Sequence, residues 1–100
     1  MPKYQINITE IAEQDLFETI EYIALDNPSA ALQLADEIEQ SILRLEDFPL
    51  LGVIPKNRRL AIKGYRILIA SDYLVFYVID HETVDIRRIL SGKRNYIKLF

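Results

Sequence analysis

The sequence predicts an α+β fold: an N-terminal strand, an antiparallel helical hairpin and then a three-stranded antiparallel meander, with the helices on one face of a four-stranded sheet. Two observations predict it. Apolar side chains recur at helical spacing in the first half of the chain, and strand-like runs fill the second half. The chain has 100 residues, half of them hydrophobic and 27% charged, which predicts one globular domain over residues 1–100.

The first strand and the first helix are expected to follow each other directly. Residues 3–8 alternate polar and apolar side chains, as a half-buried strand does. Thr9 can cap a helix, because its hydroxyl accepts from the first free amides. Apolar residues then recur at helical spacing from Ala12 to Ile23, so the first helix is expected at about residues 10–25.

A second helix is expected after a short break. Asn27 can act as its cap, and Pro28 suits the first helical position because the missing N–H is not needed there. The second apolar stripe predicts a helix at about residues 29–46, ending before Pro49. Because the break is short, the two helices are expected to form an antiparallel hairpin.

Residues 48–63 show no clean period, although a short strand is expected around residues 59–62. Three strand-like runs follow, at residues 65–70, 73–79 and 84–90. The middle run is almost wholly apolar, which is typical of a central strand covered on both faces. Short polar links join the runs, so an antiparallel meander is predicted, with His81 in a turn.

Alternation along the strands predicts which side chains face the helices. In the first run of the meander, Tyr65, Ile67 and Ile69 are the larger apolar set and are assigned to the helix side. Arg66 is then expected on the face without helices. In the last run Val84 and Ile86 are expected to point inward, which places Asp85 and Arg87 outward. Arg88 breaks this pattern, either because a β-bulge re-aims it or because the strand ends there and leaves it at the rim.

Composition limits the kinds of site that the chain can hold. Without cysteine and with His81 as its one histidine, it has no thiolate or multi-histidine metal site, and we expect no cofactor. No apolar run has the length of a membrane span and no signal-peptide pattern is present, which favours a cytoplasmic protein without a membrane partner.

Charge is divided unevenly along the chain. Residues 1–50 hold 11 acidic and 2 basic residues, whereas residues 51–100 hold 4 acidic and 10 basic ones. The net charge of −3 argues against a general nucleic-acid binder, but the basic half suggests a surface that meets an anion. The alternative is that folding brings the two halves together and neutralises both.

Four cations are expected to gather on the face without helices: Arg66, Arg87, Lys93 and Arg94. Guanidinium groups that converge repel one another unless an anion lies between them, and their shape suits phosphate. The competing interpretation is that each arginine is solvated and forms a weak surface ion pair, for example Arg87 with Asp85.

Several segments together resemble the RelE/ParE superfamily of bacterial type II toxins. These are the strand–helix–helix–strands order, "NPSAA" between the helices, "FPLLG" after them, "GYR" before the meander and "GKRNY" near the end. The resemblance spans essentially the whole chain. It implies a growth-inhibiting toxin whose partner is a cognate antitoxin protein.

The RelE-like branch would imply cleavage of mRNA on the ribosome by attack of the ribose 2′-OH on its own phosphate, without a metal. On this resemblance Arg66 and Arg94 would stabilise the scissile phosphate, and Tyr96 would stack on or orient a base. The remaining RNA-contacting or phosphate-contacting residues would be Lys56, Arg59, Lys63, Arg87 and Lys93. This is the function that we expect first.

Three departures keep other functions open. Tyr96 follows Arg94 more closely than in the RelE pattern, no residue is an obvious general base, and the helices are long and acidic. Long helices joined by "NP" are more similar to the ParE branch, whose members poison DNA gyrase and need no catalytic residues. A third possibility is a relative that is not toxic and only binds its antitoxin.

Overall fold

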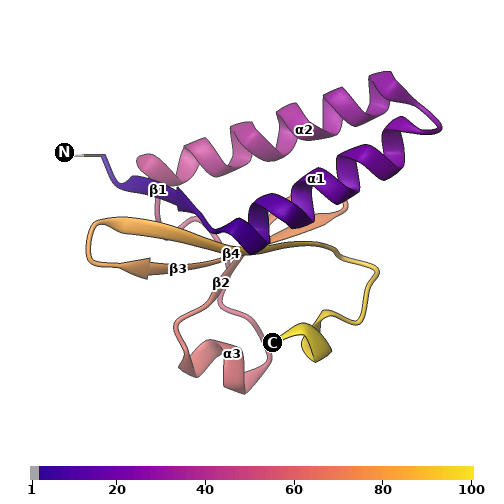
Figure 1. The fold of residues 1–100 in the computed structure, drawn as a ribbon. Coiled ribbons are helices and arrows are strands. Elements are labelled where there is room, and N and C mark those ends of the chain that lie inside the picture. Colours follow the sequence, from indigo (N-terminus) through magenta and orange to yellow (C-terminus); the bar gives the residue numbers. More distant parts are fainter. Residues whose placement is uncertain (1–2) are drawn as a thin grey trace.

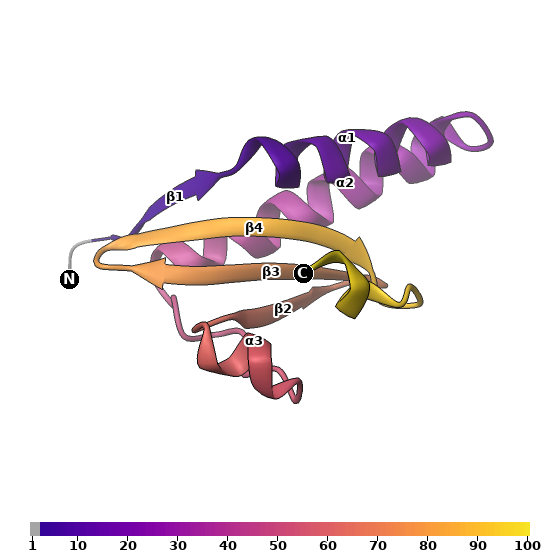
Figure 2. The ribbon, with the colours of Figure 1, turned by 60° about the horizontal axis from the view of Figure 1, so that its bottom comes forward.

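The computed structural model describes residues 3–100. Its sheet contains β1 (Gln5–Ile8), β2 (Arg66–Ala70), β3 (Tyr73–Asp80) and β4 (Thr83–Ser91), in the spatial order β1-β4-β3-β2. The two long helices lie together on one face of this sheet (Figures 1 and 2). The predicted fold class is therefore confirmed. β2, β3 and β4 form the expected antiparallel meander, and β1 pairs in parallel with β4.

The helical hairpin forms where the capping residues predicted it. α1 (Glu10–Ala24) begins after Thr9, whose hydroxyl accepts from the Ala12 amide at 3.2 Å and donates to the Ile86 carbonyl at 2.8 Å. α2 (Pro28–Leu43) begins after Asn27, whose side chain accepts from the Ala30 amide. The last predicted turn of this helix is a 3-10 turn, η1 (Arg44–Glu46).

Apolar side chains form a cluster on each face of the sheet. The helix-side cluster is the larger, and its buried members are Ala12, Leu34, Ile38, Ile42, Leu45, Leu68, Ala70, Val75, Tyr77, Val84, Ile86 and Ile89. The tail-side cluster has the buried members Leu60, Ile67, Phe76 and Leu90. Because β3 contributes to both clusters, the prediction of a central strand covered on both faces is confirmed.

The chain after β4 folds back onto the tail-side cluster. Tyr96, Ile97, Leu99 and Phe100 pack there, around the turn η2 (Tyr96–Leu99). The ring centroid of Phe76 lies 5.1 Å from that of Tyr96 and 4.8 Å from that of Phe100. The tail therefore covers the face of the sheet that the helices leave free.

The prediction of a short strand around residues 59–62 is wrong, because this segment forms helix α3 (Arg58–Ile62). Asn57 caps the helix by accepting a hydrogen bond from the Leu60 amide at 3.1 Å, and Leu60 is buried in the tail-side cluster. Strand-like pairing occurs earlier, where Val53 and Ile67 exchange two backbone hydrogen bonds.

The face assigned to β2 is also wrong. Leu68 and Ala70 lie in the helix-side cluster, whereas Ile67 lies in the tail-side cluster and Ile69 is 65% exposed. The prediction assumed that the larger apolar side chains of β2 face the helices, but α3 and the tail provide a second apolar layer that buries Ile67. Arg66 therefore lies on the helix side.

In the part of the chain that the structure describes, no helix has both the length and the apolar character needed to cross a membrane.

Candidate functional site

Arg66 is held by the loop that joins η1 to α3. One of its terminal nitrogens donates to the Gly52 carbonyl at 2.8 Å and to the Leu50 carbonyl at 3.4 Å. Arg66 pairs with Tyr77 across β2 and β3, and the Tyr77 hydroxyl accepts from the Gly52 amide and donates to the Pro49 carbonyl, both at 2.8 Å. The guanidinium thus fixes the loop against the sheet.

Burial raises the pKa of Tyr77, and the Gly52 amide and the charge of Arg66 oppose this shift. The hydroxyl therefore stays protonated near neutral pH and keeps its donor role toward Pro49. Donor and acceptor are both used, as a buried phenol requires.

Gly52 is the residue that allows this close contact. A Cβ at this position would lie 2.7 Å from the ring and the hydroxyl of Tyr77 and 3.0 Å from the Ile67 carbonyl. We expect Gly52→Ala to lower the free energy of unfolding by about 1–3 kcal/mol through overpacking, as measured by urea denaturation. Leu50→Ala, on an exposed side chain of the same loop, is the control, and equal losses would contradict this explanation.

Arg88 and Asp15 join the tail end of β4 to α1. The register moves from the pair Phe76–Arg88 to the pair Tyr77–Ile86, so Arg87 is the extra residue of the expected bulge. Arg88 donates twice to the Asp15 carboxylate, at 2.8 Å each.

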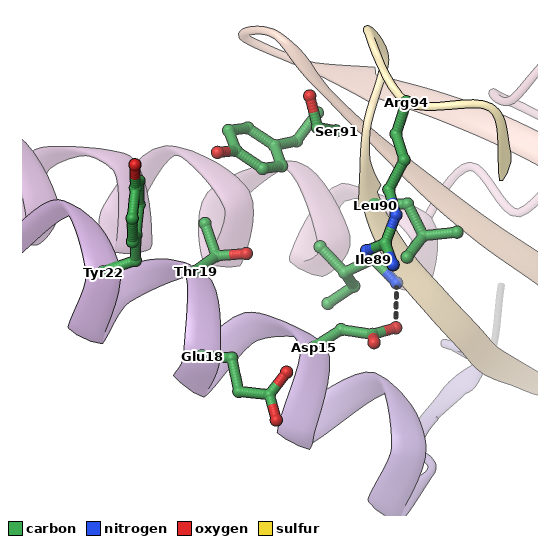
Figure 3. Close-up of a pocket in the computed structure, with 9 residues that line it drawn as sticks. Asp15, Glu18, Thr19, Tyr22, Ile89, Leu90, Ser91 and Arg94 are labelled. Atoms are coloured by element: carbon green, nitrogen blue, oxygen red, sulfur yellow. Dashed lines mark hydrogen bonds between the residues drawn. The ribbon is translucent and has the colours of Figure 1, made fainter.

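Asp15 also accepts from the Ile89 amide at 3.0 Å, a bond drawn in Figure 3. Hydrogen bonding to Asp15 raises the pKa of Arg88, so this arginine stays charged.

Arg94 lies at a hollow between α1 and the end of β4 (Figure 3). The α1 side of the hollow carries Asp15, Glu18, Thr19 and Tyr22, and the sheet side carries Tyr73, Ile89, Leu90 and Ser91. The acidic helix and the exposed Arg94 therefore face the same space.

The remaining predicted residues lie around α3, the bulge and the tail. Arg59 donates to the main-chain oxygen of Phe100 at 3.2 Å, and the ring of Tyr96 packs on Phe76. Lys63 and Arg87 line a second hollow, and Arg87 is hydrogen-bonded to Asp85. Exposed positions with no part in these contacts are Lys56 and Lys93.

The predicted convergence of the cations on one face is wrong. Arg66 lies on the helix side, whereas Arg87 lines the hollow beside the tail. Along β3, Arg66 is level with Tyr77, and Arg94 follows Ser91, which is level with Tyr73. Four strand residues separate these levels by about 13 Å. The roles predicted for the individual side chains stay predictions.

Few ion pairs join the acidic first half of the chain to the basic second half. Among residues 3–100, the ion pair of Arg88 with Asp15 is the one that joins them. The helical hairpin also carries exposed carboxylates at Glu18, Glu21, Asp36, Glu37 and Glu39. Within the described residues, no group of three or more His, Asp or Glu side chains could hold a metal ion.

A family model described as the ParE toxin of the type II toxin–antitoxin system parDE matches residues 6–96. The chain belongs to this family. It is thus a ParE-like toxin of a type II toxin–antitoxin system, within the RelE/ParE superfamily that the sequence resembles. A search of curated proteins found no match.

Solved structures share the fold of this ParE-like toxin. A chain of the chromosomal ParDE system from P. aeruginosa has a TM-score of 0.74 and 17% identity, with 89% of this chain and 96% of that chain covered. A chain of the RelBE2 toxin–antitoxin complex from Mycobacterium tuberculosis has a TM-score of 0.58 and 28% identity, with 89% and 98% covered. A copper-bound mutant toxin from Helicobacter pylori has a TM-score of 0.56 and 15% identity, with 97% and 99% covered.

Sequence reasoning missed two groups that shape this toxin. Asp15 could have been singled out from the sequence, because it is a carboxylate directly beside the apolar stripe of the first helix. The contact of Gly52 with Tyr77 was harder to predict. A glycine in an apolar loop indicates a close approach of the backbone, but the sequence does not identify the residue that it meets.

Proposed function

We propose that this toxin inhibits growth by binding a protein target of the DNA gyrase class through its α1–α2 hairpin. The observation that carries the proposal is a set of large apolar side chains on the hairpin that the described chain leaves exposed: Phe17, Tyr22, Leu25 and Leu32. Tyr22, Leu25 and Leu32 are 78%, 86% and 72% exposed. Exposed apolar groups with a polar rim are typical of protein–protein contacts.

The charges around these side chains indicate what the target surface carries. Glu18, Glu21 and Asp26 are exposed beside them, and the hairpin extends beyond the sheet (Figure 1). A complementary surface would have apolar pockets edged by basic residues. The acidic hairpin is poorly suited to the phosphates of RNA, which it would repel.

Ribosome-dependent cleavage of mRNA is the second candidate function. It is favoured by the exposed cations on and beside α3, Lys56, Arg58, Arg59 and Lys63. It has less support, because the two arginines expected to hold one phosphate lie at different levels of the sheet, and Arg66 already binds loop carbonyls.

A gyrase supercoiling assay tests the proposal. We expect the double variant Leu25→Glu, Leu32→Glu to inhibit purified gyrase at least about tenfold less than the parent toxin, because charge at a contact replaces apolar burial. Leu50→Glu, on an exposed loop leucine away from the hairpin, is the matched control.

Primer extension on mRNA from induced cells separates the two functions. New mRNA ends inside codons that are absent with the Arg94→Ala variant would support cleavage. If the toxin also leaves gyrase activity unchanged, the gyrase proposal is overturned. DNA breaks without such ends would support the proposal.

A further inference from the structure

A second hollow, of about 270 Å³, lies beside the bulge of β4, between the start of α1 and the tail. Its apolar walls are Ile11, Tyr65, Leu99 and Phe100, and the last two belong to the tail. The ring of Phe100 meets that of Tyr65 edge to face, with centroids 5.2 Å apart. The hollow is large enough for one or two side chains and too small for a folded partner to enter.

One of the three cations that line this hollow has no ion-pair partner among the described residues. Lys63, Arg87 and Arg88 line it. Arg87 is paired with Asp85 and Arg88 with Asp15. Lys63 is exposed and, among the ion pairs of residues 3–100, takes part in none. One carboxylate entering the hollow could form an ion pair with Lys63.

The surroundings favour a peptide over a nucleic acid. Glu10 and Glu13 are exposed on the first turn of α1, next to Ile11 on the wall. A nucleic acid would bring its neighbouring phosphates toward these two carboxylates and would be repelled. A peptide can place one carboxylate at Lys63, apolar side chains on the walls and a basic residue near Glu10 and Glu13.

We propose that this hollow binds an acidic residue within an apolar segment of the cognate antitoxin. The carboxylate meets Lys63 and the free edge of the Arg87 guanidinium, and the flanking apolar side chains cover Tyr65 and Phe100. The inference rests on the family's antitoxin partner and not on the gyrase target proposed above. The segment would also pin the tail, because Leu99 and Phe100 form part of the wall.

Titration calorimetry with the purified cognate antitoxin tests the proposal. We expect Lys63→Glu to weaken antitoxin binding by at least about tenfold, because the reversed charge repels the incoming carboxylate. Arg87→Gln should weaken binding less, since this guanidinium is already shared with Asp85. Both side chains are exposed, and unchanged thermal melting would show that each variant is folded.

Lys93→Glu is the matched control, because it makes the same charge change at an exposed lysine beyond the end of β4. It should alter the affinity by less than about twofold. A charge reversal in one acidic antitoxin residue that restores binding to Lys63→Glu would identify the contacting carboxylate.

Three results would overturn the proposal. One is unchanged binding by Lys63→Glu, and another is an equal loss in Lys93→Glu, which would indicate net charge alone. The third is a Lys63→Glu variant that binds a 20-nucleotide RNA more weakly than the parent toxin while its antitoxin binding is unchanged. That result would assign the hollow to a nucleic acid. Gyrase inhibition is measured without antitoxin, so failure of either proposal is recognised separately.

Discussion

Replacing Phe76 by alanine is expected to lower the free energy of unfolding by about 3–5 kcal/mol, the largest loss of any single change considered for this toxin. Phe76 is fully buried, and its ring contacts those of Tyr96 and Phe100. Truncation removes the surface on which the tail packs. Since native domains are stable by only about 5–15 kcal/mol, this loss removes a large share of the total and should lower the melting temperature clearly.

Urea denaturation followed by circular dichroism measures this loss. Phe76→Leu keeps most of the volume and should cost about 1–2 kcal/mol while it loosens the tail. Phe17→Ala, on an exposed phenylalanine of α1, should have little effect on stability. Amide exchange in residues 96–100 that stays unchanged in Phe76→Leu would contradict the role assigned to this ring.

Replacing Asp15 by alanine is expected to cost about 2–4 kcal/mol, because it leaves a half-buried guanidinium without its partner. The side chains of Asp15 and Arg88 are 10% and 20% exposed. Three hydrogen bonds end on this carboxylate, two from Arg88 and one from the Ile89 amide. The substitution removes the polar contact between α1 and the C-terminal end of β4.

A double-mutant cycle with Arg88→Ala measures the coupling directly. Glu18→Ala is the control, because Glu18 lies one turn further along α1 and is exposed. It should change stability by less than about 0.5 kcal/mol. Additive losses for Asp15→Ala and Arg88→Ala would show that the two side chains do not act as a pair.

The fold was predictable wherever local chemistry decides it. Thr9 and Asn27 are residue types that commonly cap helices, and each accepts the capping hydrogen bond that its position predicts. The apolar run of β3 predicts a strand that is covered on both faces. The face of β2 was not predictable in this way. Its orientation depends on α3 and the tail, which supply apolar cover from distant parts of the chain.

The candidate site was less predictable than the fold. The family resemblance identified Arg66 and Arg94 by their motifs, but a motif does not report which face of a strand a residue occupies. The partners of Arg66 are backbone carbonyls of a loop without periodicity. The hollow beside Lys63 depends on the bulge at Arg87, whose position is set by pairing between β3 and β4.

The parallel pairing of β1 with β4 has a consequence for synthesis of the toxin. Gln5 to Ile8 pair with Thr83 to Ile86, so the first strand finds its neighbour only after the intervening residues 9–82 have been made. Contacts so distant in sequence slow folding, because a long loop must close first. The helical hairpin can form early on the ribosome, but β1 cannot pair with β4 until β4 has emerged.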